Sequence, residues 1–66
     1  LDAIEELPQP YRSVIRMRFF HDMGYRDIAE CLRIPIGTVK SRLNYGLKGL
    51  ARILRVRRIS RDLLEH

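Results

Sequence analysis

The chain has 66 residues, which suffice for one domain, and a domain of this size buries only about 60% of the surface that its unfolded form exposes. Thirteen lysines and arginines stand against eight acids, and the net charge of +5 is typical of a small domain that binds nucleic acid. The pattern lacks an acid pair, a Ser-His pair or a metal-binding cluster, so neither an enzyme nor a cofactor is expected.

The single cysteine, Cys31, excludes a disulfide and is expected as a buried apolar residue in a reducing, cytoplasmic setting. No apolar run is long enough to cross a membrane, and no signal peptide is recognisable. Because the chain starts without Met, it is expected to be a piece of a longer protein. Residues 64–66 resemble a vector-derived scar before a polyhistidine tag.

In chain order, the first predicted helix covers residues 2–7, with Asp2 as its cap, and Pro8 ends it. The second covers residues 10–21, with Pro10 in its first turn, where a missing N–H costs nothing. Its predicted apolar stripe consists of Tyr11, Val14, Ile15 and Phe19.

A turn precedes the third predicted helix, residues 25–32, which has Gly24 at its N-cap and Ile28, Ala29 and Leu32 on its inner face. Pro35 opens the fourth, residues 35–54. Its predicted inward stripe is Val39, Leu43, Leu47, Leu50 and Leu54. The basic tail, residues 55–63, has Val56, Ile59 and Leu63 at helical spacing; an amphipathic helix and a frayed end both remain open.

The third and fourth helices have the spacing of a helix-turn-helix. Ala29 is small where a second helix must cross, the turn follows four residues later, and Val39 fills the angle between the helices. A short connection makes the second helix project from the body, so that it can enter a major groove. The sequence therefore predicts an all-α, four-helix domain over residues 1–54 that contains a helix-turn-helix.

The outward face of the fourth helix is predicted to contact DNA, since no acid occurs between Cys31 and Arg61. Its polar residues can donate and accept at base edges, and they are Lys40, Ser41, Asn44, Tyr45 and Lys48. At the start of the helix, Gly37 allows close approach, and Thr38 with the N–H groups of residues 36–38 suits a phosphate. Arg42 lies on a flank within reach of a phosphate.

Four segments resemble the C-terminal domain of extracytoplasmic-function sigma factors: residues 7–15 (LPQPYRSVI), 18–20 (RFF), 25–32 (YRDIAECL) and 34–43 (IPIGTVKSRL). The last segment is the most specific, and the likeness spans about residues 1–54. It implies a four-helix domain whose last helix reads the upstream, minus-35 element of promoter DNA. It also implies two protein partners, the RNA polymerase beta-flap and an anti-sigma factor, and no direct membrane contact.

Carried over by position, the resemblance assigns base contacts to Lys40, Ser41, Asn44 and Tyr45, and DNA-backbone contacts to Arg18, Tyr25, Thr38 and Arg42. Gly37 and Lys48 are also expected at the backbone. Arg33 stands where the family has Gly, which predicts a turn of different shape. Asn44 to Leu47 replace the family's basic cluster, which predicts an altered promoter preference.

A further surface is predicted away from the DNA face, because a domain this small cannot bury all its apolar residues. We expect it to bind a partner helix through Ile4, Leu7, Tyr11, Ile15, Leu47, Leu50 and Leu54. The alternative, that all seven residues form the core, stays open.

Two other interpretations remain. One is a helix-turn-helix output domain of the response-regulator type, similar to the LuxR group, which usually dimerises through a final helix. The other is an interaction module whose basic face binds an acidic protein. The oligomeric state tests the first, and binding to random-sequence duplex tests the second.

Overall fold

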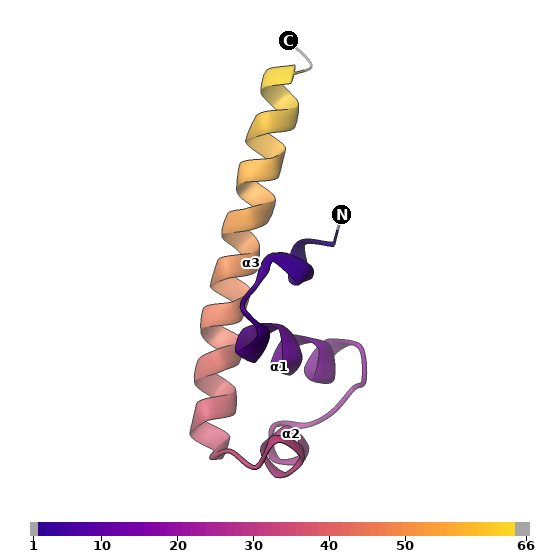
Figure 1. Ribbon diagram of the computed structural model, residues 1–66, viewed down its shortest axis with the longest axis vertical. Helices are drawn as coiled ribbons and strands as arrows, with labels where there is room; N and C mark the ends of the chain where they lie inside the picture. The colour runs from indigo at the N-terminus through magenta and orange to yellow at the C-terminus, as the bar shows by residue number, and fades with distance from the viewer. Residues whose placement is uncertain (1, 65–66) are drawn as a thin grey trace.

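The computed structural model describes residues 2–64, in which helices are joined by short loops and no strand occurs (Figure 1). A short 3₁₀ helix, η1 (Ala3–Glu6), precedes the α-helices α1 (Gln9–Phe19), α2 (Tyr25–Leu32) and α3 (Ile36–Leu64). The predicted all-α class is confirmed, but the count of four α-helices is not. Three are α-helical, and the segment predicted as the first helix is a single 3₁₀ turn.

The first segment is short because a cap and a proline enclose it. The Asp2 carboxylate accepts a hydrogen bond from the Ile4 N–H at 2.9 Å, as predicted for the cap. Leu7 closes the turn by donating its N–H to the Ile4 carbonyl at 3.1 Å, and Pro8 then stands at the N-cap of α1. Only one turn therefore fits between Asp2 and Pro8.

Arginines of α1 hold η1 in place from the outside. Arg16 forms an ion pair with Glu5 and lies 3.4 Å from Asp2, and Arg12 donates to the Glu5 carbonyl at 3.2 Å. The hydrogen bond to Glu5 raises the pKa of Arg16 further above its already high value. Because these pairs are exposed to water, they orient η1 more than they stabilise it.

Helix α1 ends two residues earlier than predicted. Phe20 and His21 both donate their N–H groups to the Arg16 carbonyl, and Asp22 has a positive φ of 53°. As a result Phe19, predicted in the apolar stripe, is 58% exposed and lies outside the core. The prediction for Phe19 was wrong, because this residue ends α1 and is not among those that pack against the core.

The turn between α2 and α3 keeps the left-handed conformation that a glycine would adopt. Arg33 has φ 57° and ψ 47°, so the predicted change of shape does not occur. The Ile34 N–H donates to the Ala29 carbonyl at 3.0 Å and the Arg33 N–H to the Glu30 carbonyl at 3.4 Å, the bonds of a Schellman motif. Ile34 then packs against the core and holds Arg33 in this conformation.

The core lies where the three α-helices meet. Val14 and Ile15 of α1, Ile28 of α2 and Val39 of α3 are at most 2% exposed, and Leu43 is 5% exposed. Gly46 allows α1 and α3 to approach closely, since a Cβ there would lie 2.8 Å from Ile15 Cδ1 and 3.2 Å from Tyr11 Cβ. A glycine that costs helix propensity is thus explained by helix packing.

The inward stripe of α3 differs from the prediction after Leu43. It continues through Gly46, Leu50 and Ile53, whereas Leu47 and Leu54 are 42% and 50% exposed. The predicted inward positions of Leu47 and Leu54 were wrong. Gly46, and not Leu47, faces α1 at this level of the helix, because it lies against Ile15 and Tyr11.

Helix α3 has 29 residues and includes the basic tail without interruption. The frayed alternative for residues 55–63 therefore does not hold, and the molecule measures 48 × 19 × 16 Å. Leu64 is the last helical residue, while Glu65 and His66 of the suspected tag scar lie outside the described residues. Within residues 2–64 no helix has the length and apolarity to span a membrane.

Candidate nucleic-acid interface

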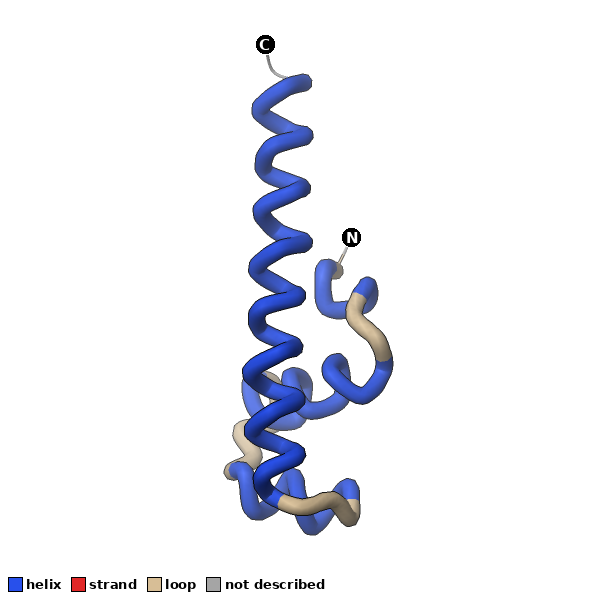
Figure 2. The backbone as a smooth tube through the Cα atoms, turned by 90° about the vertical axis from the view of Figure 1, so that its left-hand side faces the viewer, coloured by secondary structure: helices blue, strands red, loops and turns tan. Residues whose placement is uncertain are grey.

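Helices α2 and α3 form the predicted helix-turn-helix. The connection between Leu32 and Ile36 is short, and Val39 at the angle is fully buried. All other elements pack on one side of α3, and Figure 2 shows α3 in front of them when the molecule is seen from its free side. One full side of α3 is therefore available to a ligand along its length.

The first four turns of α3 present polar side chains on this free side. Burial of Val39 and Leu43 turns the intervening positions outward, and five predicted DNA-contacting residues are all exposed: Lys40, Ser41, Asn44, Tyr45 and Lys48. The Lys48 ammonium lies 5.8 Å from the centroid of the Tyr45 ring, so these two side chains stand together. The face offers amide, hydroxyl, phenol and ammonium groups, which can read base edges.

The N-terminus of α3 is open to close approach. Gly37 is exposed, and a Cβ at this position would meet no atom within 4 Å, so no packing contact requires glycine here. Thr38 already donates its N–H to the Pro35 carbonyl at 3.0 Å. Of the three N–H groups predicted to bind a phosphate, only those of Ile36 and Gly37 therefore remain available.

Two predicted DNA-backbone residues from different helices lie side by side. The Arg18 guanidinium stands over the Tyr25 ring at 5.6 Å from its centroid and donates to the Met23 carbonyl at 3.3 Å. Arg18 therefore joins the end of α1 to the start of α2. Arg42, another residue predicted to contact the DNA backbone, is half-buried on the flank of α3.

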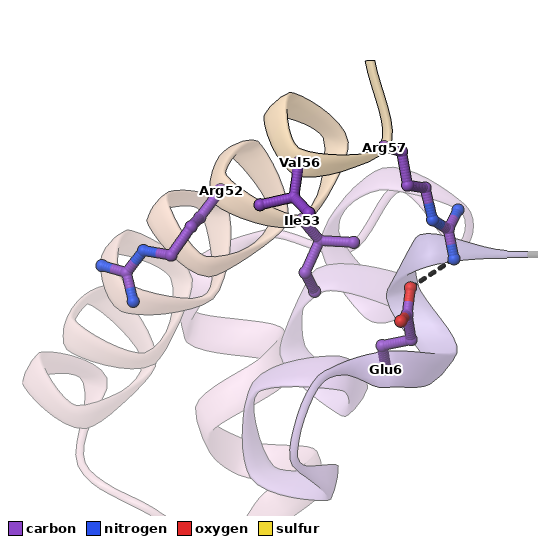
Figure 3. Close-up of a pocket in the computed structure, with 5 residues that line it drawn as sticks. All are labelled: Glu6, Arg52, Ile53, Val56 and Arg57. Atoms are coloured by element: carbon purple, nitrogen blue, oxygen red, sulfur yellow. Dashed lines mark hydrogen bonds and ion pairs between the residues drawn. The ribbon is translucent and has the colours of Figure 1, made fainter. Parts of the chain in front are cut away.

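The ion pairs in the described part of the chain all involve acids near its N-terminal end. They join the N-terminal acids Asp2, Glu5 and Glu6 to Arg12, Arg16 and Arg57. The Glu6–Arg57 pair closes one side of an apolar groove between η1 and α3 (Figure 3). None of these acids is paired with Lys40 or Lys48, so the free side of α3 keeps its positive charge.

The predicted partner surface does not exist as drawn. Ile4, Leu7 and Ile15 are at most 8% exposed and belong to the core, so the core alternative holds for these three. Tyr11 and Leu50 are half-buried against the core, and only Leu47 and Leu54 are exposed. Cys31, predicted as buried, is also exposed, because the inner face of α2 is made by Ile28, Ala29 and Leu32.

The sequence predicted DNA-contacting residues on α3 only as far as Lys48, but the same side of the helix extends further in the structure. Because α3 does not stop at Leu54, the exposed residues Arg52 and Arg55 follow on the same side of the helix. The signal was present in the sequence, since Ser41, Lys48 and Arg55 are spaced by seven residues. Phe19 and Phe20 were also missed as exposed residues next to Arg18, at 58% and 64%.

Comparison with known proteins gives a family match. Residues 1–50 match the family described as "Sigma-70, region 4". The chain is 40% identical over 52 residues to the ECF RNA polymerase sigma factor SigW of Bacillus subtilis, a match that covers 79% of the chain and 28% of that protein. It is 37% identical over 62 residues to the RNA polymerase sigma factor SigV of the same organism, covering 94% of the chain and 35% of that protein.

A third relative is the ECF RNA polymerase sigma factor RpoE of Cereibacter sphaeroides, 40% identical over 48 residues, or 73% of the chain and 26% of that protein. The chain thus corresponds to about a quarter to a third of the length of these relatives. The matches are to sigma factors and favour that interpretation over a response-regulator output domain.

Proposed function

Because the chain belongs to the sigma-70 region 4 family, which consists of transcription initiation factors and not enzymes, we propose that it is the part of an extracytoplasmic-function sigma factor that reads the minus-35 promoter element. In this role the chain acts in the cytoplasm and directs RNA polymerase to its promoters. The observation that carries the proposal is the acid-free, exposed side of α3, on which Lys40, Asn44 and Lys48 stand next to one another in space.

Base recognition is assigned to the first turns of α3. Asn44 can form two hydrogen bonds with an adenine edge, and Lys40 can donate to guanine. The Ser41 hydroxyl can donate to or accept from either base, and Tyr45 adds a phenol group on an apolar ring. Since this set carries amide and phenol groups in place of the family's basic cluster, we expect a promoter preference different from that of relatives with the cluster.

Orientation on the duplex is assigned to residues around the reading face. Arg18, Arg42 and Lys48 supply charge to phosphates, and Tyr25 and Thr38 supply hydroxyl groups. Arg18 and Tyr25 hold each other at 5.6 Å, which reduces the freedom that each would lose on binding. Gly37 and the N-terminus of α3 admit a phosphate close to the backbone.

Two protein partners complete the proposal, the RNA polymerase beta-flap and an anti-sigma factor. The surface now assigned to them is smaller than the sequence indicated. It consists of the exposed Leu47 and Leu54, with Leu50 between them on α3 and Tyr11 of α1 half-buried against the core. An apolar strip of this kind on a small domain suits the apolar face of a partner helix.

Selection of duplexes from a random pool by the 66-residue chain tests the proposed function. We expect enrichment of one short sequence, bound at least tenfold more tightly than a scrambled duplex of equal length. A chain that binds all duplexes alike would not be a promoter reader. A sizing column on the same sample should show a monomer; a dimer formed through Val56, Ile59 and Leu63 would support the response-regulator interpretation instead.

A further inference from the structure

The distal part of α3 stands apart from the rest of the molecule. Figures 1 and 2 both show the C-terminal turns of the helix extending past η1, with no other element beside them. Arginines are concentrated in the second half of α3, and Arg52, Arg55, Arg58 and Arg61 are all exposed. Arg52 still lies at the level of η1, because it lines the same groove as Glu6. An isolated helix segment gains nothing from carrying this much like charge, since repulsion between neighbouring arginines opposes folding.

Two of these arginines lie nearest the middle of the side of α3 that is proposed to read DNA. Seven residues make nearly two turns, so Ser41, Lys48 and Arg55 lie in one line along the helix. Arg52, four residues after Lys48, lies within about 40° of the same line. The next position in the line is Asp62, where the first acid after Glu30 ends the positive stripe.

The charge on Arg52 and Arg55 is not used within the described part of the chain. The ion pair at this level of the helix joins Glu6 to Arg57. In Figure 3 Arg52 points away from that pair, on the opposite side of Ile53 and Val56. No ion pair among residues 2–64 involves Arg52 or Arg55.

The spacing along the helix matches the border of a DNA groove. Eleven residues separate Asn44 from Arg55, or about 16 Å along the axis. The major groove of B-DNA is about 12 Å wide, so a straight helix centred in the groove at Asn44 passes over the flanking sugar–phosphate chain within this distance. Long cationic side chains on the DNA-facing side then meet phosphates and not base edges.

We propose that Arg52 and Arg55 form a second phosphate-binding site, which clamps the sugar–phosphate chain beyond the groove that the start of α3 reads. The proposal rests on the proposed function, because it takes the position of the duplex from the reading face. The ligand is the DNA backbone without regard to sequence, so the site adds affinity and fixes the tilt of α3. It contributes no base preference of its own.

Salt dependence of duplex binding tests the proposal in the double variant Arg52→Gln/Arg55→Gln. Each phosphate contact contributes about 0.9 to the slope of log affinity against log salt. We therefore expect the slope to fall by about 1.8 in the double variant, equally on the selected duplex and on a scrambled one. Arg61→Gln is the matched control. Arg61 lies about 120° round the helix from Arg55, so its replacement should leave the slope unchanged.

Duplex length gives a second, independent readout. Two duplexes should be compared that extend the selected site on one side or on the other. The wild-type chain should bind one of them more tightly and with a steeper slope, and the double variant should not distinguish them. Unchanged helical circular dichroism in the variant ensures that the difference does not arise from unfolding.

Three results separate the possible failures. If the wild-type chain selects no sequence, the proposed function itself fails. If it selects a sequence but the double variant keeps the wild-type slope on both extended duplexes, the second phosphate site is wrong. Loss of polymerase binding in the double variant with an intact DNA slope would assign these arginines to an acidic protein partner and would also overturn the proposal.

Discussion

The guanidinium group of Arg18 lies over the ring of Tyr25, 5.6 Å from its centroid, although the two residues belong to different helices. The same guanidinium donates to the Met23 carbonyl at 3.3 Å. One side chain therefore fixes the end of α1, the turn after it and the start of α2. Two residues proposed to contact the DNA backbone are in this way held next to each other across the turn.

Replacing Arg18 with Ala should weaken binding to every duplex by the same factor and lower the log–log salt slope by about 0.9. The reason is that a guanidinium on a phosphate contributes charge but reads no base. Arg12→Ala is the control, since Arg12 is engaged with Glu5 and faces away from the proposed interface. A slope that does not change in Arg18→Ala would remove Arg18 from the DNA contacts.

Replacing Asn44 with Ala should relax the preference at one base position and cost about 1–3 kcal/mol on the selected duplex, if the amide makes two hydrogen bonds to one base. Affinity for a scrambled duplex should hardly change. Lys48→Ala serves as comparison, because loss of a phosphate contact should weaken both duplexes equally. The same equal loss in Asn44→Ala would show that Asn44 contacts only the backbone.

Replacing Gly46 with Ala should lower the free energy of unfolding by about 1 kcal/mol. The added Cβ would meet Ile15 Cδ1 at 2.8 Å, and overpacking a core commonly costs 1–3 kcal/mol, of which better helix propensity returns up to about 1 kcal/mol. Gly37→Ala, where the new Cβ meets no atom within 4 Å, should not destabilise the fold. Urea denaturation of both variants makes the comparison, and a stabilised Gly46→Ala would refute the close packing of α1 on α3.

Replacing Leu54 with Glu should leave helical circular dichroism and duplex binding intact but abolish binding to the polymerase flap or to an anti-sigma factor. Leu54 is 50% exposed, so a charge there remains in water. Leu43→Ala is the contrasting variant, because Leu43 is 5% exposed and its truncation should cost about 2–5 kcal/mol of stability. Unfolding of Leu54→Glu would place Leu54 in the core, and unchanged partner binding would remove it from the interface.

Much of the fold could be predicted because the apolar spacing of α2 and of the first half of α3 is regular. Once Val39 and Leu43 are placed inward, the exposure of Lys40, Ser41 and Asn44 follows from helix geometry alone. The exposed positions of the proposed DNA face were therefore predictable, while their contacts with DNA remain predictions.

The remaining features depend on contacts between distant residues. Spacing alone favours Leu47 and Leu54 over Gly46 and Ile53 for the inner face of α3, because leucine is apolar and glycine has no side chain to bury. The close approach of Ile15 to Gly46 reverses that choice. Likewise, the left-handed Arg33 depends on the packing of Ile34 against the core. The length of α3, by contrast, follows from a local feature, since no proline or glycine occurs after Leu54.

Chemical-shift mapping tests the central claim most directly, that the free side of α3 is the DNA interface. The backbone amides of the 66-residue chain would be followed by NMR while the selected duplex is added. The largest changes should fall on residues 37–48 of α3, with smaller ones at Arg18, Tyr25 and the Arg52–Arg55 segment. Changes centred on η1 and the outer face of α1, with the first turns of α3 unaffected, would contradict the account.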